Sequence, residues 1–445
     1  MRHTSMLRKS FFTTLLLITN CLVQAQQKID YQKLKKLAYS DSARLVNIFK
    51  GIHQYPELAF TEARTSEIVA KDLTALGYNV MTGIGKTGVV GILKNGEGPI
   101  VVYRADMDCN AVKETTGLPY ASTKMVERDG VEVPVMHACG HDAHTTWMLG
   151  IAKIMVALKD QWKGTLVMVG QPAEEIVSGA KAMSAEMYEK GVPEPDYLLG
   201  MHTAPVPVGF YVNVPGYRMA GADILDVTFY GIGGHGSAPQ EAIDPIVMSA
   251  NAILQYQTII SRNIDPQSAA VITVGAVQAG TDNNVIPASS DLKLNLRWFS
   301  SSDRDFMLDG IKRINEGLAM ANNLPKDLYP KMDMIQSVSS LKNDTAMVKK
   351  VNKALEAMVG PGRNLTNFPP VMGSEDFHYL VMPLKRQVYD YFFVGVANPT
   401  DFQEARKQGK QFPFFNHNGN FKVDLSAIPY YDYLGAGALL EMFQK

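Results

Sequence analysis

The segment that decides the fold reads Val89-Val90-Gly91-Ile92-Leu93-Lys94-Asn95-Gly96-Glu97-Gly98-Pro99-Ile100-Val101-Val102-Tyr103. Two short runs of β-branched residues flank a turn rich in glycine, asparagine and proline, which is typical of a hairpin or meander. The residues before this segment have apolar side chains at helical spacing. After it, strands predicted at 165–169 and 197–200 alternate with helices predicted at 143–159 and 180–190. This alternation predicts an α/β fold in which helices cover both faces of a mixed sheet.

The pattern changes near Tyr217. The predicted elements are then a strand at 224–230, a helix at 244–260, strands at 269–277 and 292–299, a helix at 303–321 and a strand at 329–338. This βαββαβ order is typical of a ferredoxin-like unit. Strand and helix patterns resume from about residue 346 and close with a helix after Tyr431. We therefore expect a larger domain in two parts, 26–217 and 339–445, with an α+β ferredoxin-like satellite domain inserted at 218–338.

Composition limits the classes of function. The chain has 445 residues, of which 46% are hydrophobic and 20% are charged, and its formal net charge is -1. This length is too great for one ordinary core and predicts two or three domains. Because there is no basic excess, nucleic acid is not an expected partner.

The N-terminus has the pattern of a secretory signal. Basic residues precede the apolar run 11–23, which ends in Val23-Gln24-Ala25. The run is shorter than the roughly 20 apolar residues that a membrane span requires. We therefore expect a signal peptide at 1–25 and an exported protein, periplasmic or secreted, that does not stay in the membrane. A lipoprotein anchor at Cys21 is the alternative, and Asn20 before it disfavours that reading.

Removal of the signal peptide leaves two cysteines, Cys109 and Cys139. In an oxidising compartment they are candidates for one structural disulfide. The alternative is a metal thiolate at Cys139, which we favour because histidines flank it and coordination shields a thiolate from oxidation. Cys109 then stands as an added thiol that could bind metal or be oxidised.

Metal-ligand residue types concentrate in His137-Ala138-Cys139-Gly140-His141-Asp142, in the pair Glu174-Glu175, and at His202 and His417. Thiolate, imidazole and carboxylate ligands hold one or two borderline-soft divalent ions. The acidic pair follows the strand at 165–169, where an open sheet places ligands beyond its carboxyl edge. Adjacent carboxylates point in different directions, so one can bind metal while the other accepts a proton from water. A solvated acidic pair and structural histidines are the alternatives.

The histidines divide by position. His202 comes directly after the predicted strand at 197–200, close to the other candidate ligands. We assign His53, His144 and His378 to structural roles, because the ligand set is filled without them. His137 is close enough in sequence to the candidate ligands to contact them without binding metal itself.

Seven motifs occur in order along almost the whole mature chain. They are Pro56-Glu57-Leu58 with Glu62, Arg104-Ala105-Asp106-Met107-Asp108, His137-Ala138-Cys139-Gly140-His141-Asp142, Glu174-Glu175, Gly233-Gly234-His235 with Pro239, Asn284-Val285-Ile286-Pro287 and Gly373-Ser374-Glu375-Asp376-Phe377. Together they resemble the amidohydrolase branch of the dinuclear aminoacylase and carboxypeptidase G superfamily of metallopeptidases. That branch includes hippurate hydrolases and hydrolases of indole-acetyl amino acids.

The resemblance implies a centre of two divalent metal ions per subunit. Cys139 matches the ligand that bridges both ions. His141 and His202 match the other ligands of one ion. Glu175 and His417 match the other ligands of the second ion. These ligand types suit zinc best, and manganese, cobalt and nickel stay open because affinity order does not decide occupancy in a cell.

The resemblance also assigns three residues of the satellite domain to substrate. His235, Asn284 and Arg297 match positions that contact substrate, with His235 reaching across from the partner subunit of a homodimer formed through that domain. His235 is also the second catalytic residue, because with the metal it would stabilise the tetrahedral oxyanion. The planar guanidinium of Arg297 suits a substrate carboxylate. The alternatives are a simple turn at Asn284 and an internal ion pair of Arg297 with Asp223 or Asp226.

The implied activity is hydrolysis of the amide bond of N-acyl amino acids by metal-activated water. Glu174 matches the general base. A bound metal lowers the pKa of water from 15.7 toward about 7, so a carboxylate can take its proton at neutral pH and deliver it to the departing amine. A dipeptidase or carboxypeptidase on the same scaffold is the second reading. The third reading is a protein that binds metal without catalysing a reaction. Glu174 speaks against it, because a protein that only binds metal needs no free base.

Three features depart from the family pattern. Cys109 stands where the family often has alanine. His417 is followed by Asn418-Gly419-Asn420 in place of the usual serine and proline. The stretch 128–134 is longer than the usual approach to the Cys-Gly-His turn. We expect it to form a small hairpin at the rim of the cleft.

Overall fold

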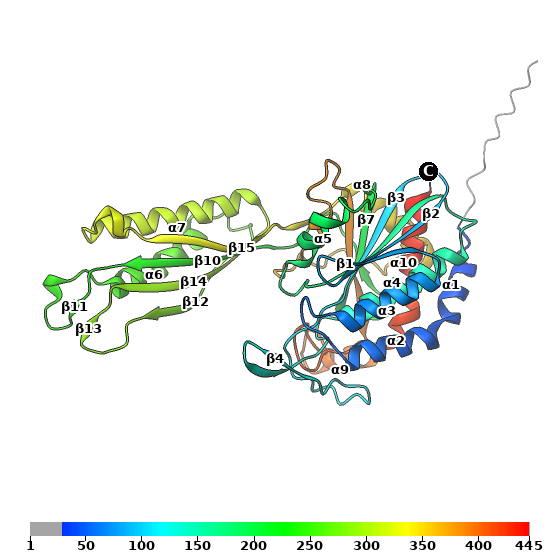
Figure 1. Ribbon diagram of the computed structural model, residues 1–445, viewed down its shortest axis with the longest axis horizontal. Coiled ribbons are helices and arrows are strands. Elements are labelled where there is room, and N and C mark those ends of the chain that lie inside the picture. Colours follow the sequence, from blue (N-terminus) through cyan, green and yellow to red (C-terminus); the bar gives the residue numbers. More distant parts are fainter. Residues whose placement is uncertain (1–28, 445) are drawn as a thin grey trace, which may run out of the picture.

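The computed structural model describes residues 29–444, so the expected signal peptide at 1–25, with Cys21, lies outside the described residues. Figure 1 shows a rounded larger domain and an elongated smaller domain beside it. Each domain is built around its own sheet. Among residues 29–444, no helix combines the length and the apolar character that crossing a bilayer requires.

Within the described residues, the larger domain contains a mixed sheet of seven strands in the order β1-β2-β6-β3-β7-β17-β8. The strands are β1 (Asn79–Ile84), β2 (Gly88–Asn95), β3 (Ile100–Asp106), β6 (Gly164–Gln171), β7 (Tyr197–Pro207), β8 (Tyr211–Val212) and β17 (Tyr389–Ala397). Strands β6, β3, β7 and β17 are parallel neighbours. Their carboxyl ends therefore meet at one edge of the sheet, the usual place for a ligand site in an open α/β sheet.

The expected hairpin between β2 and β3 does not form, because β6 lies between them, antiparallel to β2 and parallel to β3. Residues 94–99 instead carry the chain past the start of β6. There the Thr165 N–H donates to the Pro99 carbonyl. A Cβ at Gly98 would lie 2.4 Å from the carbonyl oxygen of Lys163. Both strands are almost wholly buried, and a buried strand has the same apolar pattern beside any apolar neighbour.

Helices cover both faces of this sheet (Figure 1). They are α1 (Tyr31–Ser40), α2 (Ser42–Gln54), α3 (Ala63–Ala75), α4 (His141–Ala157), α5 (Gly179–Met187), α8 (Thr345–Val359), α9 (Pro399–Lys407), α10 (Ala427–Phe443) and the short η3 (Phe377–Leu380). Alternate side chains of one strand enter different cores. In β6, Leu166 and Met168 join the core that includes α4 and α10. Val167 and Val169 join the core that includes α5 and η3. The predicted α/β class is confirmed.

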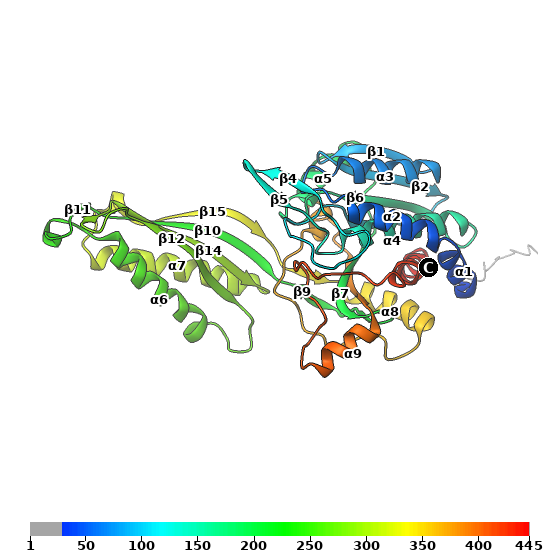
Figure 2. The same ribbon diagram turned by 90° about the horizontal axis from the view of Figure 1, so that it is seen from below.

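The smaller domain has its own antiparallel sheet with two helices packed on one face (Figure 2). Its elements are β10 (Gly221–Tyr230), α6 (Pro245–Asn263), β12 (Val271–Ala279), β14 (Ser289–Trp298), α7 (Ser301–Ala321) and β15 (Lys331–Val338). The sheet order is β12-β14-β10-β15. Leu225, Val227 and Phe229 of β10 share a core with Met248 of α6 and Ile311 of α7. These elements follow the βαββαβ order that the sequence predicts.

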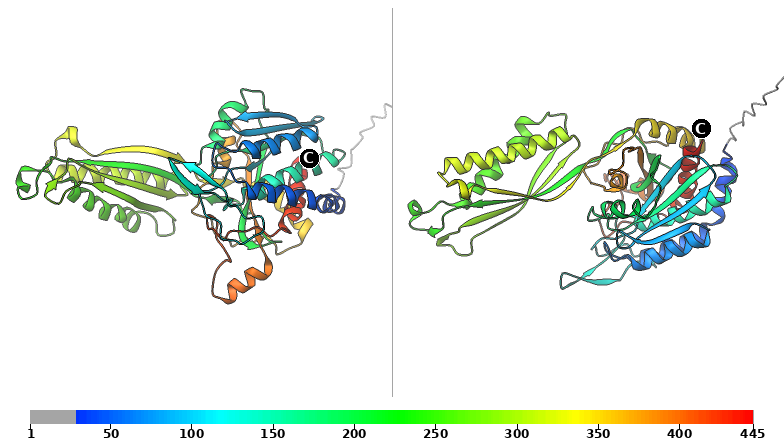
Figure 3. Two further views of the ribbon diagram at one scale, coloured as in Figure 1. Left: turned by 60° about the horizontal axis from the view of Figure 1, so that its bottom comes forward. Right: turned by 45° about the horizontal axis from the view of Figure 1, so that its top comes forward.

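Short elements join and extend the two domains. They are β4 (Met125–Arg128), β5 (Val131–Pro134), β9 (Gly216–Met219), β11 (Gly234–His235), η1 (Pro239–Glu241), β13 (Val285–Ile286), η2 (Lys326–Leu328) and β16 (Leu341–Asn343). β9 pairs with β16 where the chain leaves and re-enters the larger domain. β4 and β5 form the expected hairpin, which projects from the larger domain (Figure 3). β11 and β13 pair at the end of the smaller domain that is farthest from the larger one (Figure 1).

Candidate metal centre

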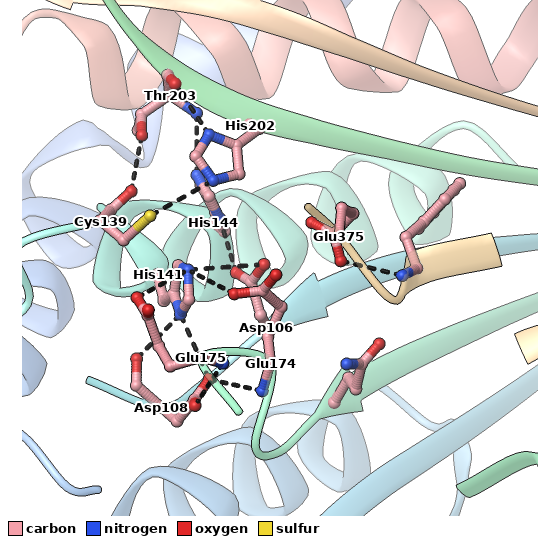
Figure 4. Close-up of polar contacts among 12 residues, drawn as sticks. Asp106, Asp108, Cys139, His141, His144, Glu174, Glu175, His202, Thr203 and Glu375 are labelled. Carbon is pink, nitrogen blue, oxygen red and sulfur yellow. Dashed lines mark hydrogen bonds and ion pairs between the residues drawn. The ribbon is translucent and has the colours of Figure 1, made fainter. Parts of the chain in front are cut away.

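The structure brings the five predicted metal ligands together in two groups that share one residue. Cys139, His141 and His202 form one group, and Cys139, Glu175 and His417 form the other. Within each group the candidate ligand atoms all lie within 4.8 Å of one another. The sulfur of Cys139 therefore lies between two positions, each surrounded by ligand atoms. Figure 4 shows the side chains of Cys139, His141 and His202 converging, with Glu174 and Glu175 on the facing loop.

A glycine turn positions the first two ligands. Gly140 has a left-handed φ of 87° at the N-terminus of α4, between Cys139 and His141. A Cβ on Gly140 would lie 2.5 Å from the Cγ2 atom of Thr203, so no larger residue fits. The Thr203 hydroxyl donates to the Cys139 carbonyl at 2.7 Å. The turn is thereby fixed against β7, the strand that carries His202.

His202 lies inside β7 and not after a strand that ends at residue 200. The strand continues because β17 runs parallel beside it, pairing Phe393 with His202 and Ala397 with Pro207. A histidine followed by prolines has the local pattern of a strand end, so the sequence prediction of this boundary was wrong. The longer strand holds His202 rigidly against the Cys139 turn.

Hydrogen bonds fix which nitrogen each buried histidine offers. His202 Nδ1 donates to the Thr203 carbonyl at 2.8 Å, which leaves its Nε2 as an acceptor 3.5 Å from the Cys139 sulfur. His141 Nδ1 donates to the Asp108 carbonyl at 2.9 Å. Its buried Nε2 has no hydrogen-bond partner among the described residues. Both rings are therefore oriented to present Nε2, as metal-binding histidines commonly are.

Glu174 and Glu175 lie on the loop after β6, at the carboxyl edge of the sheet. The Asp108 carboxylate accepts the N–H of Glu174 at 3.1 Å and the N–H of Glu175 at 3.0 Å. Glu175 Oε2 lies 3.3 Å from His417 Nε2, whereas its buried Oε1 has no hydrogen-bond partner in the described chain. Glu174 Oε2 lies 3.7 Å and Glu175 Oε1 3.8 Å from His141 Nε2. Both carboxylates thus face His141, and Glu175 also faces His417.

His417 differs from the other ligands in its exposure. Its side chain is 54% exposed, and its backbone has a left-handed φ of 61°. The His417 N–H donates to the Ala138 carbonyl at 2.7 Å, which fixes the loop against the Cys139 turn. The neighbouring Asn416 amide donates to the Cys139 sulfur at 3.5 Å. One of the two positions is therefore open to solvent on the side of His417.

The residues fit a pair of divalent cations. Nε2 of His141 and Oε1 of Glu175 are buried polar atoms without a hydrogen bond in the described chain, and such atoms are costly unless something binds them. Burial acts to raise the pKa of the Cys139 thiol, but the charges of His202 and His141 hold that pKa well below its usual value. A thiolate with imidazole and carboxylate neighbours is a donor set for zinc and similar metals.

Glu174 belongs to neither group that contains Cys139, although its carboxylate also lies within 4.8 Å of candidate ligand atoms of His141 and Glu175. It is 7% exposed. Burial, and then the negative charges of Glu375 and Glu175, raise the pKa of Glu174 well above its usual value. A nearby cation favours the charged form of such a carboxyl.

Behind the ligands lies a buried network in which the sequence predicted a role for His144 alone, a structural one. Arg104, 1% exposed, bonds Asp106 Oδ2 at 2.6 Å and Glu375 Oε1 at 2.9 Å. His144 Nδ1 bonds Asp106 Oδ1 at 2.5 Å, and its Nε2 accepts the Thr203 N–H at 2.9 Å. Both nitrogens of His144 are therefore occupied. The signal that could have found this network is the Arg104-to-Asp108 motif at the end of β3, at the same sheet edge as Glu174.

Arg297 lies at the wall of a cavity of about 710 Å³ that includes Cys139, His202, Glu174 and Glu175. Its Nη1 donates to the Ser374 hydroxyl at 2.9 Å and its Nε donates to the Asn295 side-chain oxygen at 2.9 Å. No described carboxylate lies within ion-pair distance of it. Its predicted alternative partner Asp223 is instead bound by Arg304 at 2.8 Å. The alternative of an Asp223 ion pair was therefore wrong.

The structure does not bring His235 and Asn284 to this cavity. They lie on β11 and just before β13, at the far end of the smaller domain (Figure 1). There the Gly236 N–H donates to the Asn284 carbonyl at 2.7 Å, and His235 is exposed. Both residues thus lie apart from the metal centre of their own chain.

The two described cysteines are both free and buried, so the alternative of a disulfide between Cys109 and Cys139 was wrong. Cys109 belongs to none of the candidate ligand groups in the described chain. Burial, assisted by the charge of Asp108, raises the pKa of the Cys109 thiol well above its usual value. It is therefore held as a neutral thiol near the centre.

Comparison with known proteins places this geometry in context. The model of peptidase family M20/M25/M40 matches residues 102–406. The hippurate hydrolase of Campylobacter jejuni is 39% identical, over 74% of this chain and 82% of that protein. Thermostable carboxypeptidase 1 of Saccharolobus solfataricus is 33% identical, over 88% of this chain and 94% of that protein. Bacillus subtilis YXEP, described as a dinuclear metal binding peptidase from the M20 family, superposes with a TM-score of 0.73 at 25% identity, covering 91% of this chain and 99% of that chain.

Proposed function

Because the chain belongs to peptidase family M20/M25/M40 and is a metal-dependent amidohydrolase or peptidase, we propose that it hydrolyses the amide bond of N-acyl amino acids with Glu174 as general base. The observation that carries this proposal is the position of Glu174. It is buried at the wall of the cavity, 3.7 Å from His141, and lies outside both groups of ligands that share Cys139. A carboxylate beside a metal centre and free of it can accept a proton from water.

Glu174 and Asp108 then have separate roles in the reaction. When bound, the two ions supply Lewis acidity and lower the pKa of water from 15.7 toward about 7. Glu174 takes the proton of the attacking water and delivers it to the departing amine. Asp108 holds the Glu174 and Glu175 backbone N–H groups, so the base keeps its direction while the proton moves.

We propose that Arg297 binds the carboxylate of the amino acid. Its guanidinium is half-buried at the cavity wall and has no described carboxylate partner. A planar fork of N–H donors suits a carboxylate better than a single ammonium would. The acyl group then fits the apolar side of the cavity, whose aromatic residues are Phe368, Phe393, Phe412 and Phe415.

A dipeptidase or carboxypeptidase on the same scaffold is the second candidate, and the carboxypeptidase of Saccharolobus solfataricus supports it. A dipeptide would bring a free ammonium where an N-acyl amino acid brings an apolar acyl group. The only described carboxylates that line the cavity are Glu174 and Glu175, which are already used. The cavity therefore favours an acylated amine.

We propose zinc as the native metal, with manganese, cobalt and nickel as alternatives. A thiolate shared by two positions, each with an imidazole and one with a carboxylate, suits a borderline-soft ion. Metal analysis of the protein purified from its natural host, without added metal, tests this assignment.

We propose that the protein is a homodimer formed through the smaller domain. His235 and Asn284 are distant from their own cavity, so they can contact substrate only in another subunit. β12 is an edge strand, and its Val271 and Val277 are 39% and 53% exposed. An exposed apolar edge strand is a surface that a second copy can cover.

We propose that the segment 1–25 directs export and is removed, so that the enzyme acts in the periplasm or outside the cell. The basic start, the apolar run and Val23-Gln24-Ala25 support this. Sequencing of the N-terminus of the protein from its natural host tests it, and a protein that keeps residues 1–25 would contradict it.

Replacement of the general base tests the proposed function. Glu174→Gln is isosteric and should keep both metals while lowering kcat by about 10²-fold to 10⁴-fold. The measurement is kcat on acetyl, benzoyl and aryl-acetyl amino acids and on simple dipeptides, together with the metal content of the variant. A variant with full metal content and nearly wild-type kcat would remove Glu174 from the mechanism. Faster hydrolysis of dipeptides than of every acyl amino acid would favour the second candidate.

A further inference from the structure

The base lies on a loop with an unfavourable backbone. We call residues 173–177 the catalytic loop. Ala173 has a φ of 52° and Val177 a φ of 51°, at the two ends of the loop. Left-handed φ values are rare for residues other than glycine, and a β-branched valine there is a genuine outlier. Backbone in such a conformation persists only when surrounding contacts hold it.

Contacts inside the loop account for part of this. The Val177 N–H donates to the Glu174 carbonyl at 2.6 Å, and the Gly179 N–H donates to the Ala173 carbonyl at 3.1 Å. A Cβ on Gly179 would lie 1.6 Å from the carbonyl oxygen of Pro172, so glycine is required there. These bonds close the loop on itself but do not fix its direction relative to the metal ligands.

Contacts from outside fix that direction at three points. Glu62 accepts the Ala173 N–H at 2.9 Å, and Asp108 accepts the two N–H groups that follow. Both residues belong to the larger domain. The third contact is different: Gln336 Nε2, on β15 of the smaller domain, donates to the Ile176 carbonyl at 2.7 Å. The same carbonyl accepts the Ser178 hydroxyl at 2.9 Å, a local contact that does not tie the loop to another part of the fold. Ile176 and Gln336 both line the cavity.

A β-bulge directs Gln336 toward the loop. In the pairing of β10 with β15, Ile224 lies opposite Gln336 but Leu225 lies opposite Met334, so Ile335 is the extra residue. Bulges commonly re-aim a neighbouring side chain beside an active site. Ile335 is 60% exposed, so the bulge does not serve to bury it. The backbone irregularity and the hydrogen bond therefore point to the same role.

We propose that Gln336 is a positioning residue of the smaller domain, which holds the Ile176 carbonyl so that the left-handed catalytic loop keeps Glu174 aimed at the centre. This rests on the proposed role of Glu174 as base. Gln336 acts through the loop backbone and does not contact the reacting atoms. Loss of its hydrogen bond lets the backbone near Val177 relax, and a small displacement of the base lowers the rate without removing any ligand.

Two replacements of Gln336 separate its hydrogen bond from its shape. Gln336→Met keeps the length but has no donor, and should lower kcat by about 10-fold to 100-fold, since a displacement of about 1 Å has costs of this size. KM and metal content should change much less than kcat, although Gln336 lines the cavity and Glu175 lies on the same loop. Gln336→Lys restores a donor and should recover most of kcat. The matched control is Lys181→Met, which removes the 3.3 Å contact of Lys181 with the Ser337 carbonyl, a domain contact that does not reach the loop, and should leave kcat unchanged.

The backbone conformation supplies a second, independent arm. Val177→Gly makes the left-handed φ acceptable without support, so Gln336→Met should lower kcat less than about 3-fold in that background. Amide hydrogen exchange over 173–179 should speed up in Gln336→Met and return toward wild type in Gln336→Lys. The proposal is overturned if Gln336→Met keeps wild-type kcat and exchange, or if its effect is equal or larger beside Val177→Gly. Hydrogen exchange is measured without substrate. If Glu174→Gln stayed active, the proposed function would fail, but the exchange rates would still show whether Gln336 holds the loop.

Discussion

The larger domain buries charged groups, whereas the smaller domain exposes large apolar ones. Behind the metal centre, Arg104, Asp106 and Asp108 are 1%, 0% and 0% exposed, while Leu254 and Met320 of the smaller domain are 71% and 67% exposed. Buried charge is costly unless it is paired, and exposed apolar surface commonly marks a contact with another molecule. We therefore expect the larger domain to carry the chemistry and the smaller domain to contribute contacts with other molecules.

The comparison has a direct consequence for variants. Changes in the buried network should act on metal binding and on kcat, because that network orients the ligands and the base. Changes on the smaller domain should act on KM or on the assembly of subunits. Gln336 is an exception that tests the division, since it belongs to the smaller domain and is proposed to act on kcat.

The largest expected effect concerns sharing of sites between subunits. His235→Ala and Glu174→Gln homodimers should each be nearly inactive. Loss of His235, which shares stabilisation of the oxyanion with the metal, costs about 10²-fold to 10³-fold, and loss of the general base Glu174 costs about 10²-fold to 10⁴-fold. In a mixed dimer, one site combines Glu174 of one subunit with His235 of the other. After random mixing, about half of the dimers contain one subunit of each kind, and one of the two sites in each such dimer is intact. Mixing should therefore restore about a quarter of wild-type activity.

The measurement is activity after unfolding and refolding the two variants together. As a control, either variant is mixed with the double variant, which offers no intact site and should stay inactive. Mixed dimers that form but show no gain would mean that each subunit uses its own His235. In that case the smaller domain would have to move toward the cavity of the same subunit to bring His235 to the substrate.

The next effect concerns the support behind the ligands. Asp108 accepts two N–H groups of the catalytic loop through its two carboxylate oxygens, and Asp108→Asn offers only one. Loss of such support typically weakens metal binding by 10-fold to 100-fold. Competition with a chelator measures the affinity. Asp129→Asn, on the exposed hairpin with a side chain 92% exposed, is the control and should not change it. Equal affinities in both variants would contradict the role of Asp108.

Most elements of the fold could be predicted from local sequence, because helical and strand periodicity depend on neighbouring residues. The smaller domain shows this: each predicted strand and helix of its βαββαβ unit is present. The order of the large sheet could not be predicted in the same way. β6 enters between β2 and β3 through pairing with residues about 70 positions away, and the buried strands carry no sign of which neighbour they have.

The candidate site was predictable where residue types carry the chemistry. Cys139 and His141 stand out because a thiol and an imidazole surround a glycine turn. Arg104 and Asp108 stand out only as part of a motif. Their role could not be predicted, because an acid or a base at the end of a strand looks the same whether it supports a ligand or lies in solvent. Gln336 had no signal at all, since its role depends on a bulge and on a contact 160 residues away.

Arg297 tests the smaller domain's share of substrate binding. A charge-assisted hydrogen bond contributes about 1.5–3 kcal/mol, so Arg297→Met should raise KM by about 10-fold or more with little change in kcat. A substrate whose carboxylate is replaced by an amide should be hydrolysed equally poorly by the wild-type enzyme and by Arg297→Met. Arg262→Met, on an exposed position of α6, is the control. A fall in kcat at unchanged KM would place Arg297 with the catalytic residues instead.

The smallest effect concerns the cost of buried charge in the larger domain. Asp432, on α10, is fully buried, and neither of its carboxylate oxygens has a partner in the described chain. A Cβ on Gly150 of α4 would lie 2.4 Å from its Cγ, so the two helices approach closely there. Burial, and then the charge of Asp41, raise the pKa of Asp432 well above its usual value.

The sign of the pH dependence follows from this raised pKa. Above about pH 4 the unfolded chain releases the Asp432 proton while the folded protein keeps it, so stability is lost as pH rises from there. Asp432→Asn removes this loss and should raise the free energy of unfolding at pH 7 by about 1–3 kcal/mol. The gain should disappear near pH 4. Urea denaturation at both pH values measures it, with the exposed Asp160→Asn as control. If Asp432→Asn raised the free energy of unfolding equally at pH 4 and pH 7, Asp432 would not stay protonated in the folded protein at pH 7. The larger domain would then bury the charged carboxylate without a free-energy cost.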